Sequence, residues 1–414
     1  MSLKIRLAVV MFLCFFVLGS WVVTLGLVMT KHGMGSEIGN AFSSIPIASL
    51  CTPFLMGYFV DRYFSAERVM TVLHLSGSVL LACMPHFIET GNVAGFLITL
   101  YVYNLLFMPT FSLMNNIAFG HVENAEKMPY VRLFANVGWI VPGFALGAAG
   151  LSDSPSIFYL AAIASLCLGL ASLTLPARPP AKSAQAESKL GTLEHLMSVL
   201  RSRDFMALLI GMIVISVPMA FYYAYTSTFA DAVGFKNVGA TLSAGQMSEL
   251  VAIALIPVLI KHIGYKWMLL IGMAGWVARY VLFSIGAIPA SQPLVFIGIV
   301  VHGICYDFLF VTAVIFTETL ADARSKAQAQ GVVVFCTYGL GQLIGSQVSQ
   351  FIYNRFLPPH AAGLTLALWK QFWLYPAGAA VVGFLVILVG FRGEKARQAD
   401  RRAHGDNVQV KTAM

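Results

Sequence analysis

The sequence predicts an all-α membrane protein with 12 transmembrane helices in two six-helix halves. Three observations carry this prediction. The composition is 58% hydrophobic and only 11% charged, whereas soluble domains carry about 25% charged residues. Apolar runs of about 20 residues, enough to cross a bilayer as a helix, recur along the chain. One long polar segment, 177–203, has six such runs before it and six after it.

The first apolar run, 7–30, is longer than the core of a signal peptide and lacks a small-residue cleavage site, so we interpret it as a membrane helix. Runs of this length fit helices better than the weaker alternation of a membrane barrel. The other expected spans are 37–60, 68–88, 94–119, 130–150, 155–175, 204–230, 239–261, 266–286, 294–317, 327–352 and 369–391.

The polar segment 177–203 reads as a cytoplasmic linker, and its part Leu190–Leu200 has apolar residues near helical spacing, which predicts a short amphipathic surface helix. We therefore expect an N-terminal six-helix half at 1–176, a C-terminal half at 204–391 and a basic cytoplasmic tail at 392–414. Six spans on each side suggest an internal duplication with pseudo-two-fold symmetry. Such repeats place the substrate site near the midplane, between the halves.

The basic residues set the expected orientation. With both termini in the cytoplasm, 20 of the 26 Lys and Arg residues fall inside and 4 fall in outer loops. This bias is typical of a multi-pass protein of the cell inner (plasma) membrane. It also explains the net charge of +8, so a nucleic-acid partner is not needed. We expect a monomer whose partners are the lipid bilayer, its substrate and protons.

Catalysis has little support in the sequence. The six cysteines all lie in apolar runs and form no Cys-x-x-Cys pair, which indicates packing residues and no disulfide or metal framework. No Walker loop, metal cluster or nucleophile elbow is present. The sequence therefore predicts no enzyme, no cofactor and no metal site.

Four charged residues fall within the expected spans: Arg132, Glu249, Arg279 and Asp307. Ionisable groups inside a membrane are costly and so point to function. At a rise of about 1.5 Å per residue, Asp307 and Arg279 lie at similar depth and could pair. Alternatively, Arg279 is a structural counter-charge that lowers the cost of Asp307, or its side chain extends toward the outer surface.

Polar residues accompany two of these charges. Gln246 lies three positions before Glu249, and hence on the same helix face. Arg132, Asn136 and Trp139 share one face of the fifth span. A stripe of cation, amide and indole is typical of a polar ligand wall, although Arg132 alone could be a residue of the membrane boundary.

Aromatic residues suggest further ligand contacts. The cluster Phe221–Tyr225 in the seventh span includes Tyr223, and Tyr306 adjoins Asp307. An aromatic ring can stack on a planar ligand and a tyrosine hydroxyl can donate or accept, whereas the alternative for each ring is packing. His302, five residues before Asp307, is either a hydrogen-bonded structural residue or a ligand contact.

Several local motifs occur in order from about residue 4 to 391. They are Leu18–Trp21, Glu37–Gly39, Asp61–Val69, Tyr103–Asn104, Met108–Thr110, Asn115–Ile117, Val131–Arg132, Gly138–Ile140, Gln246–Glu249, His302–Gly303, Tyr306–Phe308 and Ala327–Gly331. In these motifs the chain resembles the nucleoside:proton symporter family of the major facilitator superfamily. Phe221–Tyr223 and His302–Asp307 make it most similar to the branch of nucleoside transporters within that family.

The resemblance implies the major facilitator fold and proton-coupled uptake of purine and pyrimidine nucleosides by alternating access. It carries ligand-binding positions onto Arg132, Gln246, Glu249, Tyr306 and Asp307. The chain departs from the family pattern elsewhere. Relatives have Thr, Phe and Tyr where Asn136, Trp139 and His302 stand, and a polar pair where Ala220 and Tyr223 stand.

We therefore predict a nucleoside:proton symporter. The predicted substrate-binding residues are Arg132, Asn136, Trp139, Tyr223, Gln246, Glu249, His302, Tyr306 and Asp307. Asp307 or Glu249 would carry the coupling proton, since burial favours a neutral carboxyl group and a nearby arginine favours an ionised one. The alternatives are a carrier for a sugar, a drug/proton antiporter, or a transport-inactive sensor.

Overall fold

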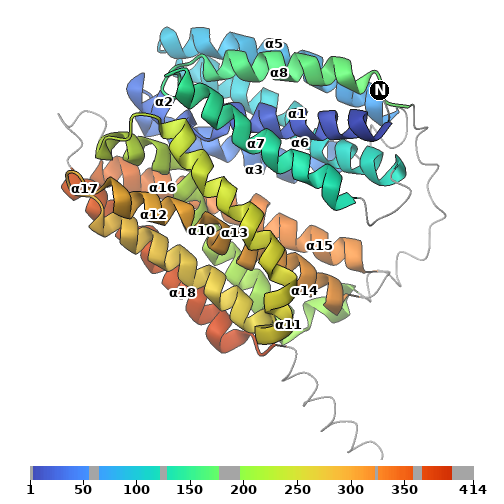
Figure 1. The fold of residues 1–414 in the computed structure, drawn as a ribbon, viewed down its shortest axis with the longest axis vertical. Coiled ribbons are helices and arrows are strands. Elements are labelled where there is room, and N and C mark those ends of the chain that lie inside the picture. Colours follow the sequence, from blue (N-terminus) through green and yellow to red (C-terminus); the bar gives the residue numbers. More distant parts are fainter. Residues whose placement is uncertain are drawn as a thin grey trace, which may run out of the picture.

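The computed structural model describes residues 3–55, 65–121, 128–176, 196–321, 325–357 and 366–393. Within these ranges the chain forms helices and no strand. Figure 1 shows the helices in two groups, one from each half of the chain. The predicted linker up to residue 195, the tail from residue 394 and the side chain of Arg132 lie outside the described residues, while 196–200, at the end of the predicted surface helix, is helical.

The first group holds six spans. Because a bilayer offers the backbone no hydrogen-bond partner, each apolar run satisfies its own peptide groups as a helix. The helices are α1 and α2 (Leu3–Val22, Leu25–Lys31), η1 and α3 (Gly35–Glu37, Ile38–Leu55), α5 (Ala66–Glu89), α6 (Val93–His121), α7 (Met128–Ala148) and α8 (Ile157–Ser172).

The second group also holds six spans, and the predicted twelve-helix fold is thereby confirmed. Its helices are α10 (Arg203–Val233), α11 (Val238–Ile285), α12 to α14 with η4 (Gln292–Val300, His302–Tyr306, Asp307–Val311, Thr312–Leu320), α15 and α16 with η5 (Lys326–Val334, Phe335–Gly341, Gln342–Phe356), and α17 and α18 (Leu366–Phe372, Leu374–Gly390). The short segments η4 and η5 are π-helices within the tenth and eleventh spans.

Helix α11 contains two spans joined at Gly264. This glycine has φ 78° and ψ 170°, a region that only glycine enters readily. The chain therefore breaks direction at this residue, and the first arm (238–263) and second arm (265–285) of α11 correspond to the predicted spans 239–261 and 266–286.

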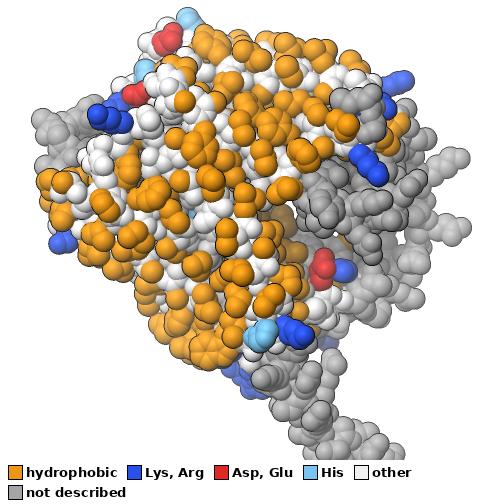
Figure 2. Space-filling model, viewed as in Figure 1, with side chains coloured by type: hydrophobic (Ala, Val, Ile, Leu, Met, Phe, Trp, Pro, Cys, Tyr) orange, Lys and Arg blue, Asp and Glu red, His pale blue; other side chains and the backbone are white. Residues whose placement is uncertain are grey.

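The outer surface of the bundle is apolar. Val72, Ile163 and Phe351 expose 62%, 62% and 73% of their surface, and Figure 2 shows such side chains over both groups of helices. In water this surface would be an aggregation hazard. In a bilayer it matches the hydrocarbon, as expected for membrane-spanning helices.

The two groups are joined by polar contacts near the end of the bundle opposite the N-terminus. Lys31 Nζ lies 2.7 Å from Asp231 Oδ2. The backbone N–H of Asn40 donates to Gln350 Oε1 at 2.6 Å. Toward the end that carries the N-terminus, the two groups diverge (Figure 1). The bundle is thus closed between its groups at one end.

Glycines allow the close approach at this closed end. A Cβ on Gly39 would lie 2.4 Å from the Ser346 carbonyl oxygen, and one on Gly143 would lie 1.9 Å from Ser243 Oγ. A Cβ on Gly147 would likewise lie 2.9 Å from Ala240 Cβ. These last two contacts show that α7 and the first arm of α11 run antiparallel, side by side.

Candidate functional site

The centre of the second group holds a fully buried arginine, Arg279 on the second arm of α11. Its Nε donates to the Gly298 carbonyl oxygen at 3.0 Å, and its Nη2 lies 2.9 Å from His302 Nδ1. The guanidinium carbon lies 4.1 Å from the ring centroid of Tyr222 and 4.6 Å from that of Trp276. Ring faces and hydrogen bonds together offset the loss of water around this cation.

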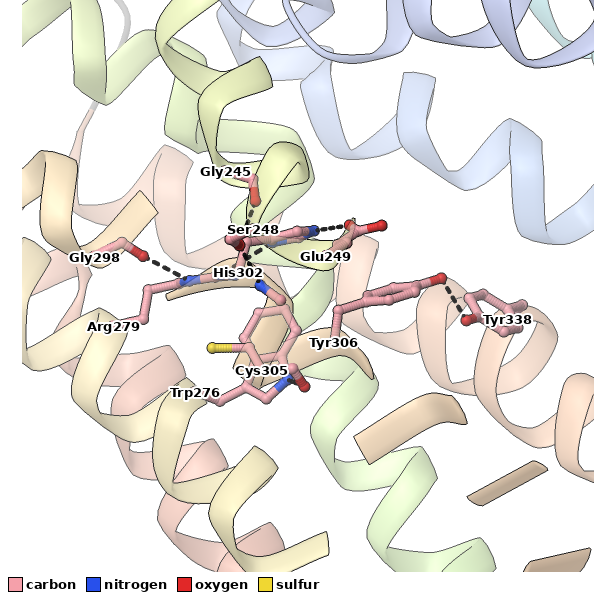
Figure 3. A network of polar contacts seen from close by, with 11 residues as sticks. Gly245, Ser248, Glu249, Trp276, Arg279, Gly298, His302, Cys305, Tyr306 and Tyr338 are labelled. Atoms are coloured by element: carbon pink, nitrogen blue, oxygen red, sulfur yellow. Dashed lines mark hydrogen bonds and ion pairs between the residues drawn. The ribbon is translucent and has the colours of Figure 1, made fainter. Parts of the chain in front are cut away.

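His302 on α13 links this cation to a carboxylate. Its Nε2 lies 2.9 Å from Glu249 Oε1, on the first arm of α11. The imidazole is fully buried, whereas the Glu249 side chain is 19% exposed. Figure 3 shows the row Arg279–His302–Glu249, with the second carboxylate oxygen of Glu249 directed away from the histidine. One imidazole thus connects the two arms of α11.

Tight backbone packing holds α13 against the first arm of α11. The Gly303 amide donates to Ser248 Oγ at 2.8 Å, and Ser248 Oγ donates to the Gly245 carbonyl oxygen at 2.6 Å. A Cβ on Gly303 would lie 2.5 Å from the Ser248 carbonyl oxygen. Glycine at 303 is therefore what brings His302 within reach of Glu249.

Asp307 and Tyr306 stand where α13 passes into the π-helix η4. Asp307 is buried, and its Oδ2 has no hydrogen-bond partner among the residues that the structure describes. The Tyr306 hydroxyl lies 2.7 Å from that of Tyr338 in the second π-helix, η5. π-Helical turns are frequent at functional sites, and here they place a carboxylate and a tyrosine pair beside the buried row.

Five buried polar atoms in and around the row lack a hydrogen bond among the described residues: Gln246 Oε1, Asp307 Oδ2, the Tyr222 hydroxyl, Arg279 Nη1 and His302 Nε2, the last of which has only its 2.9 Å ion-pair contact with Glu249 Oε1. Buried polar atoms are almost always satisfied by protein, water or a ligand. Their gathering around one site is consistent with a place where a polar molecule binds.

Helix α7, which carries Asn136 and Trp139 of the predicted polar stripe, packs against the first arm of α11. Trp139 and Gly143 are one turn apart and so share a face, and Gly143 meets Ser243 of α11. Because the helices are antiparallel, moving along α7 from Gly143 to Trp139 and Asn136 corresponds to moving along α11 from Ser243 toward Glu249. Asn136 and Trp139 are half-buried on this face.

Two arrangements differ from the simplest expectations. The sequence left open a pairing of Arg279 with Asp307, but within the described part of the chain the hydrogen bonds of Arg279 go to His302 and to Gly298. The side chain does not extend toward the surface either, the other alternative named above, because it is fully buried among Tyr222, Trp276 and His302.

Sequence reasoning missed Tyr338. Its hydroxyl meets Tyr306, and it lies close enough to Glu249 and Asp307 to be electrostatically coupled to both. The available signal was a tyrosine in the middle of the predicted span 327–352, beside Gly339 and Gly341. No charged neighbour in the sequence drew attention to it.

Comparison with known proteins agrees with this architecture. The family described as Nucleoside H+ symporter matches residues 1–396. The protein named "Putative nucleoside transporter YegT" of Escherichia coli (strain K12) is 31% identical over 401 residues, which covers 94% of this chain and 93% of that protein. The xanthosine permease of the same organism is 30% identical over 413 residues, covering 95% and 96%.

Solved structures agree as well. The crystal structure of the nucleoside transporter NupG matches with a TM-score of 0.83 at 26% identity, over 95% of this chain and all of that one. A D-xylose–proton symporter shares the fold with a TM-score of 0.69 at 12% identity, over 94% and 98%. By its fold and by these matches across nearly its whole length, the chain belongs to the nucleoside H+ symporter family and has the major facilitator fold.

Proposed function

We propose that this protein carries nucleosides, purine and pyrimidine, into the cell together with protons, by alternating access and without catalysing a reaction. Membership of the nucleoside H+ symporter family supports this function. The proposed location is the cell inner membrane with both termini in the cytoplasm, since 20 basic residues then lie inside and 4 outside.

One observation carries the proposal in structural terms: polar groups and aromatic rings converge where the two groups of helices face each other. Gln246 and Glu249 follow Ser243 along α11, and Ser243 lies against the α7 face that carries Asn136 and Trp139. A nucleoside has ribose hydroxyls and a flat base. Carboxylates and amides suit the hydroxyls, and an indole or phenol ring suits the base.

We assign roles accordingly. Gln246, Glu249 and Asp307 would bind the ribose, with Arg132 and Asn136 on the opposite wall. Trp139, Tyr223 and Tyr306 would stack on or border the base. The unpaired Gln246 Oε1 and Asp307 Oδ2 support the first assignment.

The closure of the bundle supports alternating access. The groups are joined at the end that the proposed orientation places outside, by contacts such as Lys31–Asp231, and diverge toward the cytoplasm (Figure 1). This arrangement is that of a carrier whose site opens inward. Transport requires a second arrangement in which the outer contacts part and the inner ends meet.

The test is uptake into vesicles that contain the purified protein, under an imposed proton gradient. Labelled uridine and adenosine should accumulate only with the gradient, and unlabelled nucleosides should compete better than sugars or dyes. Competition by a sugar or a dye instead would favour another class of carrier.

Two variants test which carboxylate carries the coupling proton. Asp307→Asn and Glu249→Gln remove one ionisable group each with little change of shape. If one of them carries the coupling proton, that variant should lose gradient-driven accumulation while still exchanging labelled for unlabelled nucleoside. If both variants retain accumulation, neither carboxylate is the proton carrier.

A further inference from the structure

His302 is fully buried, and each of its ring nitrogens lies close to a charged side chain, although Nε2 makes no hydrogen bond of ordinary geometry among the described residues. Nδ1 lies 2.9 Å from Arg279 Nη2, and Nε2 lies 2.9 Å from Glu249 Oε1. Its ring is also held from the sides, because it stacks on Tyr222 and Tyr306 with centroid distances of 5.0 and 5.7 Å. A side chain fixed on every side offers no free atom to a transported molecule.

These contacts determine the tautomer of the imidazole. A guanidinium has only N–H donors and stays protonated in proteins, so Arg279 Nη2 donates and His302 Nδ1 accepts. A nitrogen that accepts carries no proton, and in a neutral ring the proton is then on Nε2. The N–H group is therefore on the side of the ring that lies 2.9 Å from Glu249 Oε1. A second proton on Nδ1 would break the bond to Arg279 and set two cations side by side.

We propose that His302 is a positioning residue: Arg279 holds it as a neutral Nε2–H donor, and this donor fixes Glu249 Oε1. Only Oε2 of Glu249 then remains for a nucleoside hydroxyl or for the coupling proton. The inference rests on the proposed function, and it gives His302 a different role from the ligand contact expected from the sequence.

The arrangement assigns the proton to one oxygen. Oε1 faces the Nε2–H group at 2.9 Å, so a proton that binds Glu249 attaches to Oε2, which is directed away from the histidine (Figure 3). The contact of Nε2–H with Oε1 is favourable whether Glu249 is ionised or neutral, since the carbonyl oxygen of the acid also attracts an N–H group. Glu249 can thus gain and lose a proton without leaving its position.

Other groups share this electrostatic environment. Besides His302, the titratable or charged side chains coupled to Glu249 in the described residues come from α10, the second arm of α11, η4, α13 and η5: Tyr222, Tyr223, Arg279, Tyr306, Asp307 and Tyr338. A shift of the pH profile must therefore be compared with a variant that leaves all of these in place.

The first test compares His302→Gln with His302→Asn. The longer glutamine amide can donate from about the position of Nε2, whereas asparagine ends near Nδ1 and cannot reach Glu249. Uptake of labelled uridine and adenosine by the asparagine variant should show a KM raised about tenfold, the size of effect expected for one lost buried hydrogen bond. The glutamine variant should stay close to the wild type.

The pH profile separates positioning from general damage. Without the donor the ionised form of Glu249 is less stable, so its proton leaves at higher pH. The uptake profile of the asparagine variant should move upward by about one pH unit. The matched control is His74→Asn, because His74 is also fully buried but bonds Ser165 in the first group. Its profile should not move.

The second test uses the wild-type protein with 15N-labelled histidine, and the His302→Gln spectrum identifies the His302 signals among those of nine histidines. Nuclear magnetic resonance should show a neutral Nε2–H ring that stays unchanged between about pH 5 and 8, the range in which free histidine titrates. An imidazolium or an Nδ1–H ring would overturn the inference. So would a wild-type KM and pH profile in the asparagine variant.

The two proposals fail in different ways. If the wild-type protein accumulates neither uridine nor adenosine under a proton gradient, the proposed function is wrong, while the 15N measurement still decides the tautomer. If the asparagine variant does not fold, as judged by its melting curve, the 15N spectrum of the wild-type protein alone decides whether His302 is the neutral Nε2–H tautomer.

Discussion

The hydroxyl oxygens of Tyr306 and Tyr338 lie 2.7 Å apart, and this contact joins the tenth and eleventh spans where both contain a π-helical turn. The pair borders the proposed nucleoside site, since both tyrosines are electrostatically coupled to Glu249. The Tyr338 hydroxyl thus fixes the orientation of Tyr306, which would contact the substrate.

Tyr338→Phe removes one hydroxyl and keeps the ring. The loss of one hydrogen bond, worth about 1 kcal/mol, should raise the KM for nucleoside uptake about fivefold with little change in the maximal rate. Tyr375→Phe is the matched control, because Tyr375 is 42% exposed on α18. An unchanged KM in Tyr338→Phe would mean that the pair has no part in binding.

Much of the fold could be predicted because its causes are local in the sequence. Apolar runs define the spans, and the polar segment after residue 176 marks the division into halves. Even the sharp turn at Gly264 was expected, as a short loop between two spans. The π-helical turns were not, because they add one residue to a helical turn without any distinctive composition.

The sequence predicted many residues of the candidate site, but not the contacts between them. Glu249, Asp307 and Arg279 stood out as charges in apolar runs, but their partners depend on how separate helices face each other. Depth counting placed Arg279 level with Asp307, whereas rotation about the helix axes decides the contact and turns Arg279 toward His302. Tyr338 was missed for the same reason.

The closed end of the bundle should depend on Gly39. A Cβ at this position would lie 2.4 Å from the Ser346 carbonyl oxygen and 2.5 Å from Gln350 Cβ, so Gly39→Val cannot be accommodated without moving α3 from α16. We expect this variant to shift the protein away from the closed arrangement and to slow uptake. Gly378→Val is the control, because no described residue beyond its own turn of helix has a heavy atom within 4 Å of a Cβ built there.

The shift can be measured as a distance between spin labels at Asp153→Cys and Lys236→Cys. These loops flank the hydrogen bond from the Gly239 amide to Ser152 Oγ, which joins the groups at the same end. The background should carry serine at the exposed Cys83 and Cys167. A longer label distance in Gly39→Val, but not in Gly378→Val, is the expected outcome; equal distances would exclude this glycine as a determinant of closure.

Gly264→Ala tests the turn between the arms of α11. Among the described residues, chain neighbours aside, nothing lies within 4 Å of a Cβ built there, and φ is +78°, so the cost comes from backbone conformation. We expect a loss of about 1 to 3 kcal/mol in stability, seen as a lower melting temperature in detergent. Gly331→Ala also has free space, but within a helix, and should be neutral or slightly stabilising. Equal melting temperatures of the two variants would contradict backbone strain at position 264.

Arg279 and Glu249 should be coupled in stability through His302, although their side chains do not bond directly. Arg279→Gln removes the cation that faces Glu249 across His302, and the cost of breaking a direct buried charge pair, about 3 to 5 kcal/mol, is the upper bound for the loss. The variant should melt well below the wild type. Glu249→Gln in the same chain removes the uncompensated carboxylate, so the double variant should recover part of the loss.

A double-mutant cycle on the melting free energies isolates this coupling. A positive interaction of about 1 kcal/mol or more between residues linked only by His302 would mean that the imidazole transmits the charge of one to the other. The cycle repeated in a His302→Asn background supplies the decisive comparison, because the bond from Nε2 to Glu249 is then missing. The coupling should fall toward zero there; coupling that persists would mean that Arg279 acts on Glu249 through space and that the histidine only fills the gap between them.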